Sequence, residues 1–240
     1  MDTLKFENKG GVSMIAHRGL SGLERENTCP AFVAAGQRSY FGIETDVQIT
    51  KDGKFILCHD SNLLRVAGVD LAIKETDFDT LRSVRFTDVV NDFPRADVFL
   101  PTLEEYLHIC KKYDKYPVLE IKDTFNEQQT ARLVDVIKGF DMIGSMFFIS
   151  FSRESCLNVK KVCPEAKIQY LSNGDADESA NFCIENGFDA DFHFNLITKE
   201  LVDKLHAAGH LVNCWTVNTL EIAEKVKACG VDFITTNILE

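Results

Sequence analysis

The sequence lacks several features that mark particular broad classes of protein. Its formal net charge is −11 at pH 7, whereas proteins that bind nucleic acid or an anionic membrane surface present basic patches. No apolar run reaches the length of a transmembrane helix, and residues 1–8 contain no basic region leading into an apolar run. We therefore expect no nucleic-acid partner, no transmembrane segment and no signal peptide.

The cysteines lack the spacing of a disulfide framework. The chain contains eight of them, but no two form a CxxC pair. Several lie inside apolar strand or helix patterns, where a thiol behaves as a small hydrophobic group. This usage is typical of a reducing compartment, so we expect a cytoplasmic protein.

The chain also lacks a Pro-, Gly- or Ser-rich linker, so we expect residues 1–240 to form one domain. Short apolar runs predict eight strands, near 12–17, 42–49, 116–121, 146–151, 167–171, 189–194, 210–217 and 231–236. Helical patterns alternate with them, near 28–39, 102–113, 126–138, 153–162, 176–186, 198–208 and 219–229. This α/β alternation favours a (β/α)8 TIM barrel over an open doubly wound sheet. Few residues follow the last predicted strand, so we expect the eighth helix to be missing and the N-terminal segment to be a candidate for covering the gap.

Two segments interrupt the alternation. Asp52-Gly53 lies between two strand patterns and predicts a hairpin, which brings His59 back toward the strand at 42–49. Residues 61–100 have no clear period, so we expect a small insertion after the second strand at the mouth of the barrel. Long loops in compact domains are usually functional.

Acidic residues stand near the ends of two predicted strands. Glu44 and Asp46 are two residues apart, so both side chains point to the same face of their strand. Glu120 ends the next strand of the barrel. The carboxyl ends of the strands form the active-site face of a TIM barrel, and neighbouring carboxylates need a cation or a shared proton to coexist. We predict that Glu44, Asp46 and Glu120 bind one divalent cation, Mg²⁺ or Ca²⁺.

Basic and titratable residues accompany these acids. Arg18 follows the predicted strand at 12–17, Lys122 follows the one that ends in Glu120, and both are suited to binding a phosphate group. His17 and His59 are the candidate acid and base, because imidazole titrates near neutral pH. Taken singly, each of these residues is more often structural. Their convergence on one rim of the barrel indicates a catalytic site.

A protein nucleophile is missing. The chain has no Gly-x-Ser-x-Gly motif, and Cys58 and His59 face opposite sides of their strand because they are adjacent. The attacking group is then either water activated by the metal ion or a hydroxyl of the substrate.

These residues resemble the glycerophosphodiester phosphodiesterase family over nearly the whole chain. The resemblance lies in ordered blocks: His17-Arg18-Gly19 with Glu26-Asn27-Thr28, Glu44-x-Asp46-Val47-Gln48-x-Thr50-Lys51-Asp52-Gly53, His59-Asp60, Pro101-Thr102-Leu103-Glu104-Glu105, Glu120-Ile121-Lys122, Ser150-Phe151 and Trp215-Thr216-Val217-Asn218. The chain departs from the family at Asn237, where an Asp is common, and at Arg65-Val66-Ala67, where Arg-Thr-Thr is common.

The resemblance implies hydrolysis of glycerophosphodiesters, such as glycerophosphocholine or glycerophosphoethanolamine, to sn-glycerol 3-phosphate and an alcohol. It assigns the metal ligands, the histidine pair and the phosphate-binding cations as above, and adds Trp215 as an apolar wall of the substrate pocket. It also implies attack by a hydroxyl of the substrate through a cyclic phosphate, which would explain the missing nucleophile.

Two alternatives remain at this point. One is a phospholipase D-like enzyme acting on lysophospholipids, and the other is a non-catalytic phosphoester-binding barrel. The sequence leaves open the alcohol, the preferred metal, the oligomeric state and which histidine is the acid.

Overall fold

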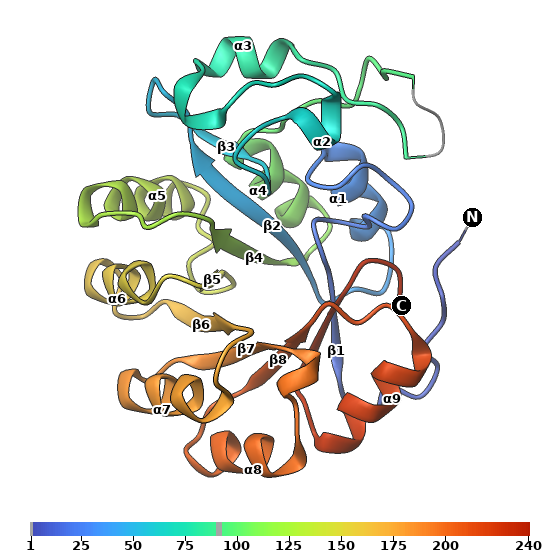
Figure 1. Ribbon diagram of the computed structural model, residues 1–240, viewed down its shortest axis with the longest axis vertical. Coiled ribbons are helices and arrows are strands. Elements are labelled where there is room, and N and C mark those ends of the chain that lie inside the picture. Colours follow the sequence, from blue (N-terminus) through green and yellow to red (C-terminus); the bar gives the residue numbers. More distant parts are fainter. Residues whose placement is uncertain (1, 90–92) are drawn as a thin grey trace.

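The computed structural model describes residues 2–89 and 93–240 and shows a closed parallel barrel surrounded by helices (Figure 1). In this part of the chain, eight strands pair in parallel in the order β1-β9-β8-β7-β6-β5-β4-β2, and pairing of β1 with β2 closes the ring. The strands are β1 (Ser13–Ala16), β2 (Gly42–Ile49), β4 (Tyr116–Ile121), β5 (Phe147–Ser150), β6 (Lys167–Ser172), β7 (Asp189–His193), β8 (Val212–Trp215) and β9 (Phe233–Thr236). The predicted (β/α)8 fold is confirmed.

Helices pack around the outside of the barrel (Figure 1). They are α1 (Cys29–Gly36), α4 (Leu103–Lys112), α5 (Glu127–Gly139), α6 (Arg153–Val162), α7 (Ala176–Asn186), α8 (Lys199–Ala207) and α9 (Leu220–Cys229). Each begins after a residue whose side chain accepts a backbone hydrogen bond from the first turn: Thr28, Thr102, Asn126, Ser152, Asp175, Thr198 and Thr219. Such caps stabilise helix starts by roughly 1 kcal/mol each, and here they fix the loops that follow the strands. Among the described residues, no helix combines the length and apolarity needed to cross a membrane.

The second strand continues into the predicted hairpin. β3 (Phe55–Leu57) pairs antiparallel with β2. The insertion at 61–100 follows it and contains α2 (Leu64–Ala67), a 3₁₀ turn (Ile73–Glu75) and α3 (Phe78–Ser83), while its residues 90–92 lie outside the described part. A small apolar cluster of its own stabilises the insertion: Ile56, Cys58, Leu63, Val66, Ile73, Leu81, Phe86, Val98 and Leu100.

The interior of the barrel is packed separately from the layer between strands and helices. One end is filled by aromatic rings, of which Phe41 and Tyr116 stack at 4.2 Å between centroids and Phe147 and Phe233 lie 5.8 Å apart. On the outside, the Tyr106 hydroxyl of α4 donates to Ile43 O of β2 and accepts from Val118 N of β4. The two strands that carry the acidic residues are therefore joined just beneath them.

The N-terminal segment lies beside the last residues of the chain. Leu4 pairs with Leu239, and Phe6 N donates to Glu240 O. The Phe6 ring is buried in the layer between strands and helices. The segment therefore packs at the β9–β1 seam, as the sequence analysis anticipated.

Five of the eight predicted strands are shorter than expected, and two of them bear on the site or differ most. β1 ends at Ala16 rather than at residue 17 because the backbone turns at Arg18 and Gly19, which have φ angles of +55° and +74°. A Cβ on Gly19 would lie 2.7 Å from the backbone of Ala31, so only glycine fits this turn against α1. The strand expected at 210–217 is confined to Val212–Trp215.

Candidate active site

Three buried carboxylates meet at the C-terminal end of β4, beside the middle of β2. Asp46 lies directly opposite Glu120 in the parallel register, and ligand oxygens of Glu44, Asp46 and Glu120 all lie within 4.8 Å of one another. All three residues are buried. The structure therefore brings the three predicted metal ligands together.

The electrostatics of this cluster call for positive charge. Burial, reinforced by the neighbouring Asp46 carboxylate, raises the pKa of Glu44 well above its usual range and that of Glu120 to about 8. Burial acts in the same direction on Asp46, but Arg18 and Lys122 outweigh it and lower its pKa. The Oδ1 atom of Asp46 has no hydrogen-bond partner within the described residues. Such a set of oxygen donors fits a hard divalent cation.

The two predicted phosphate-binding cations contact the acids. Lys122 Nζ lies 2.9 Å from Glu120 Oε1 and 3.6 Å from Asp46 Oδ1. Arg18 Nε lies 3.5 Å from Asp46 Oδ2, and the Arg18 backbone N–H donates to Glu44 Oε2 at 2.7 Å. Arg18 also donates from its side chain to Glu26 at 2.8 Å. Both cations are thus held at the acidic cluster.

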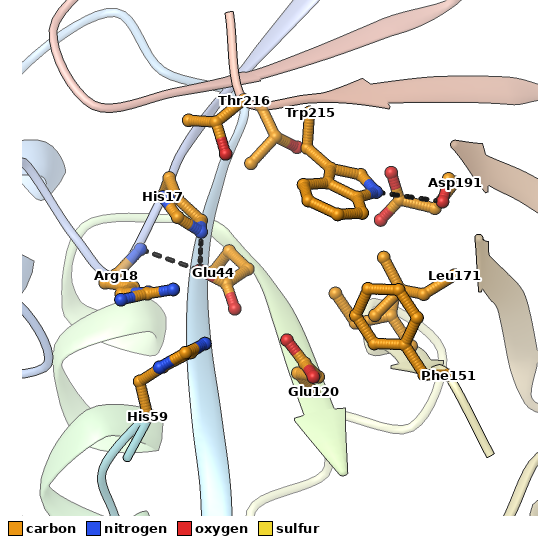
Figure 2. Close-up of a pocket in the computed structure, with 12 residues that line it drawn as sticks. His17, Arg18, Glu44, His59, Glu120, Phe151, Leu171, Asp191, Trp215 and Thr216 are labelled. Atoms are coloured by element: carbon orange, nitrogen blue, oxygen red, sulfur yellow. Dashed lines mark hydrogen bonds and ion pairs between the residues drawn. The ribbon is translucent and has the colours of Figure 1, made fainter. Parts of the chain in front are cut away.

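His17 is fixed by an amide at the end of the barrel's last strand. Its Nδ1 lies 2.7 Å from Asn237 Oδ1, which accepts when Nδ1 carries the proton. Its Nε2 is then directed to the acids, 4.0 Å from Glu44 Oε2 (Figure 2). Burial, reinforced by the charge of Arg18, lowers the pKa of His17 to about 4. The imidazole is therefore neutral at pH 7 with one nitrogen free to accept a proton.

His59 is held by a carboxylate instead. Its Nδ1 lies 2.8 Å from Asp60 Oδ1, and Asp60 Oδ2 accepts from Arg65 Nε at 2.7 Å. Arg65 belongs to α2 of the insertion and also donates to both oxygens of Glu26. These contacts from Arg65, assisted by His59, lower the pKa of Asp60 to about 2. In Figure 2 the His59 ring points toward the acids from the side of the cluster away from Thr216.

An apolar wall faces the charged groups across the cavity. The indole of Trp215 meets Phe151 edge-on, with centroids 5.5 Å apart and planes at 87°, and packs in the same way on His193. Its Nε1–H donates to the backbone oxygen of Asp191 at 3.0 Å (Figure 2). The cavity has a volume of about 70 Å³ and is lined by residues of both kinds: His17, Arg18, Glu44, His59, Glu120, Ile149, Phe151, Leu171, Asp191, Trp215, Thr216 and Thr235.

Several supporting residues had no assigned role at the level of sequence. Asn27 adopts a positive φ of 53° and donates from its side chain to Asp46 Oδ2 at 2.7 Å. Glu26, Asn27 and Asp60 stand within the family blocks, which was a usable signal. The fold alone identifies Asn237 as the partner of His17 and Arg65 as the residue that joins Asp60 to Glu26. Cys58 is buried, which raises the pKa of its thiol to about 12, so it is no candidate nucleophile.

Comparison with known proteins agrees with this geometry. The glycerophosphoryl diester phosphodiesterase family model matches residues 17–240. A glycerophosphodiester phosphodiesterase from Caldanaerobacter subterraneus subsp. tengcongensis is 32% identical over 230 residues, covering 93% of each chain. The solved structure of an Oleispira antarctica phosphodiesterase in complex with sn-glycerol-3-phosphate is 26% identical, with a TM-score of 0.86 over 94% of this chain and 92% of that one.

A second solved structure, a glycerophosphodiester phosphodiesterase from Parabacteroides distasonis, is 28% identical with a TM-score of 0.80, covering 95% of this chain and 93% of that one. The family match and these relatives extend over nearly the whole length, including every block on which the resemblance was drawn. The chain belongs to the glycerophosphoryl diester phosphodiesterase family.

Proposed function

We propose that this chain acts as one catalytic domain that hydrolyses glycerophosphodiesters, such as glycerophosphocholine or glycerophosphoethanolamine, to sn-glycerol 3-phosphate and an alcohol. The proposal depends above all on one observation: three buried carboxylates whose ligand oxygens lie within 4.8 Å of one another, with an imidazole on either side. The Oleispira antarctica relative, described in complex with sn-glycerol-3-phosphate, supports the choice of substrate class.

The acidic cluster would hold one divalent cation, Mg²⁺ or Ca²⁺, through Glu44, Asp46 and Glu120. When bound, such an ion supplies positive charge that stabilises the charge developing on the phosphoryl oxygens. Arg18 and Lys122 add positive charge at the same place, since both lie within 4 Å of Asp46. They would bind the non-bridging phosphate oxygens.

The two histidines would move the protons. His17, neutral and with Nδ1 on Asn237, would accept the proton of the substrate hydroxyl adjacent to the phosphoester. The resulting oxygen attacks phosphorus, and the alcohol leaves with a proton donated by His59. Water then opens the cyclic phosphate with the two roles exchanged, which gives sn-glycerol 3-phosphate and restores both imidazoles. This assigns His17 as the first base and His59 as the first acid.

Product assays with the full chain test the proposal. We expect release of sn-glycerol 3-phosphate from glycerophosphocholine in the presence of Mg²⁺ or Ca²⁺, and its loss after chelation. His17→Ala should lower kcat/KM by about 10³-fold, within the range for removing a general acid or base. His108→Ala, on the exposed side of α4, is the matched control and should leave the rate unchanged.

The same assays separate the two alternatives. Faster turnover of the acylated lysophospholipid than of the water-soluble diester would replace this proposal with the phospholipase D-like activity. Binding of the diester with no turnover under any divalent ion would leave a non-catalytic barrel. Full activity in a sample shown to be free of metal would exclude the role given to the acidic cluster.

A further inference from the structure

One side of the barrel interior is lined by polar side chains. Gln169 of β6, Asp191 of β7, Asn213 of β8 and Thr235 of β9 are all buried, with Asp191 only 1% exposed. Asn213 and Thr235 hydrogen-bond each other, and Asn213 also donates to Gln169 at 3.4 Å. This row lies across the barrel from the strands that carry the acidic cluster, β2 and β4.

Within this row, Asp191 combines a buried oxygen with access to the cavity. Its Oδ1 atom has no hydrogen-bond partner in the described part of the chain, and the residue lines the cavity beside Trp215. Figure 2 shows its carboxyl group next to the indole, on the side of the cavity opposite His17 and His59. Gln169 has an unpartnered amide nitrogen as well, but it does not belong to the cavity lining.

A buried oxygen of this kind requires a partner, because an unsatisfied buried polar atom costs roughly 1–3 kcal/mol. Burial, reinforced by Glu120, raises the pKa of Asp191 well above its usual range. A carboxyl oxygen accepts a hydrogen bond from a hydroxyl group whether or not the carboxyl group is protonated. A hydroxyl of the substrate can donate such a bond, whereas a quaternary ammonium has no N–H to donate.

The surroundings limit the size of that partner. Leu171 and Trp215 line the cavity beside Asp191, and Phe151 packs edge-on against the indole. A small carbon skeleton with a terminal hydroxyl fits this partly apolar part of the cavity. The constant part of every proposed substrate is the glycerol group.

We propose that the Asp191 carboxyl group binds the terminal hydroxyl of the substrate's glycerol group and thereby selects glycerol diesters over diesters that lack this hydroxyl. The inference rests on the proposed function for its choice of ligand. Sites built to hydrogen-bond a substrate hydroxyl reject the analogue without it strongly. Asp191 is thus a specificity-determining residue that takes no part in proton transfer.

Binding measurements test the assignment without requiring turnover. Calorimetry with Mg²⁺ or Ca²⁺ present would compare sn-glycerol 3-phosphate with 2-hydroxypropyl phosphate, which lacks only the terminal hydroxyl. The unmodified chain should bind the analogue about 10- to 100-fold more weakly. In Asp191→Ala this ratio should fall to within about 2-fold, and Asp191→Asn should retain part of it because an amide still hydrogen-bonds a hydroxyl.

Gln169→Leu is the matched control, because it alters the same buried row without altering the cavity lining. Its ratio should equal that of the unmodified chain. An equal loss of discrimination in Gln169→Leu and Asp191→Ala would overturn the proposal in favour of a purely structural role. An unchanged affinity ratio in Asp191→Ala would also overturn the proposal. It would indicate that the carboxyl oxygen binds an ordered water molecule rather than the substrate.

Turnover then distinguishes this proposal from the proposed function. Choline release from glycerophosphocholine and from 2-hydroxypropyl phosphocholine should show the same ratios in kcat/KM. A chain that binds sn-glycerol 3-phosphate with the expected ratio but hydrolyses neither diester refutes the function and supports the subsite. If Asp191→Ala instead changed the preference between choline and ethanolamine diesters, the residue would face the alcohol and the assignment would be wrong.

Discussion

The two sides of the barrel mouth differ in how their charged and polar groups are arranged. Around β1, β2 and β4, charged groups of opposite sign lie within 4 Å of each other, and Asp46 alone contacts both Arg18 and Lys122. Around β6, β7 and β8 the interior polar groups are amides and the Asp191 carboxyl group, whose pKa is raised by burial, and Trp215 and Leu171 line the cavity on the same side. Under the proposed function, one side would bind the reacting phosphate and the other side would bind the group attached to it.

Removing one acid from the charged side should have the largest effect. In Asp46→Asn, Arg18 and Lys122 lose the carboxylate they share, and the cation loses a ligand. We expect kcat/KM to fall by about 10³-fold, or about 4 kcal/mol, and calorimetry to show weakened Mg²⁺ or Ca²⁺ binding. Asp79→Asn, on the exposed surface of α3, should change neither. Retained metal affinity in Asp46→Asn would contradict the ligand set.

A cation on the same side should matter less than a ligand. Lys122→Met keeps the length of the side chain but removes its charge, so kcat/KM should fall by about 10²-fold through loss of phosphate stabilisation. Lys122→Arg should recover part of this loss. Steady-state kinetics provide the measurement. If Lys122→Met and Lys122→Arg lowered kcat/KM equally, Lys122 would act through its packing against Glu120 rather than through its charge.

A change on the apolar side should alter binding more than chemistry. Trp215→Leu removes the indole that packs on Phe151 and donates to Asp191 O. We expect KM to rise about 10-fold while kcat stays within about 3-fold, as for loss of an interaction made equally in the ground and transition states. A fall in kcat at constant KM would show that the two sides are not functionally separate.

The smallest effect on activity should come from the N-terminal seam, which belongs to neither side. Glu240 accepts hydrogen bonds from Lys5, Thr3 and Ser39, and these outweigh burial and lower its pKa from 4.5 to about 2. A carboxylate with a lowered folded-state pKa stabilises the fold above the unfolded pKa, and this contribution is lost as the pH falls from about 4.5 to about 2. Since Lys5 is half exposed, we expect Glu240→Gln to cost only about 1–2 kcal/mol at pH 7.

Denaturant unfolding at several pH values checks this prediction. The difference in the free energy of unfolding between Glu240→Gln and the unmodified chain should be largest at pH 7 and shrink toward zero near pH 2. Turnover at pH 7 should be unaffected. A difference that persists unchanged at low pH would mean that the substitution disturbs packing rather than charge.

The sequence was most informative where charge interrupts an apolar strand. Glu44, Asp46 and Glu120 could be placed together because the ends of parallel barrel strands converge on one face. The partner of His17 could not be placed, since Asn237 is 220 residues away along the chain and meets His17 only when the barrel closes. Asp191 was missed although β7 reads Asp189-Ala190-Asp191-Phe192-His193. Alternating polar residues are equally typical of a strand with one solvent-exposed face. Closure of the barrel decides which face that is.

Arg65 of α2 donates hydrogen bonds to Glu26 and Asp60. Under the proposed function, the insertion at 61–100 would therefore contribute to turnover although it lies outside the barrel. Cleavage or displacement of the insertion would leave the barrel strands intact. It would, however, remove Arg65 from the Asp60 carboxylate that holds the His59 ring. We accordingly expect limited proteolysis within the insertion to abolish activity while the melting temperature of the cleaved protein stays unchanged.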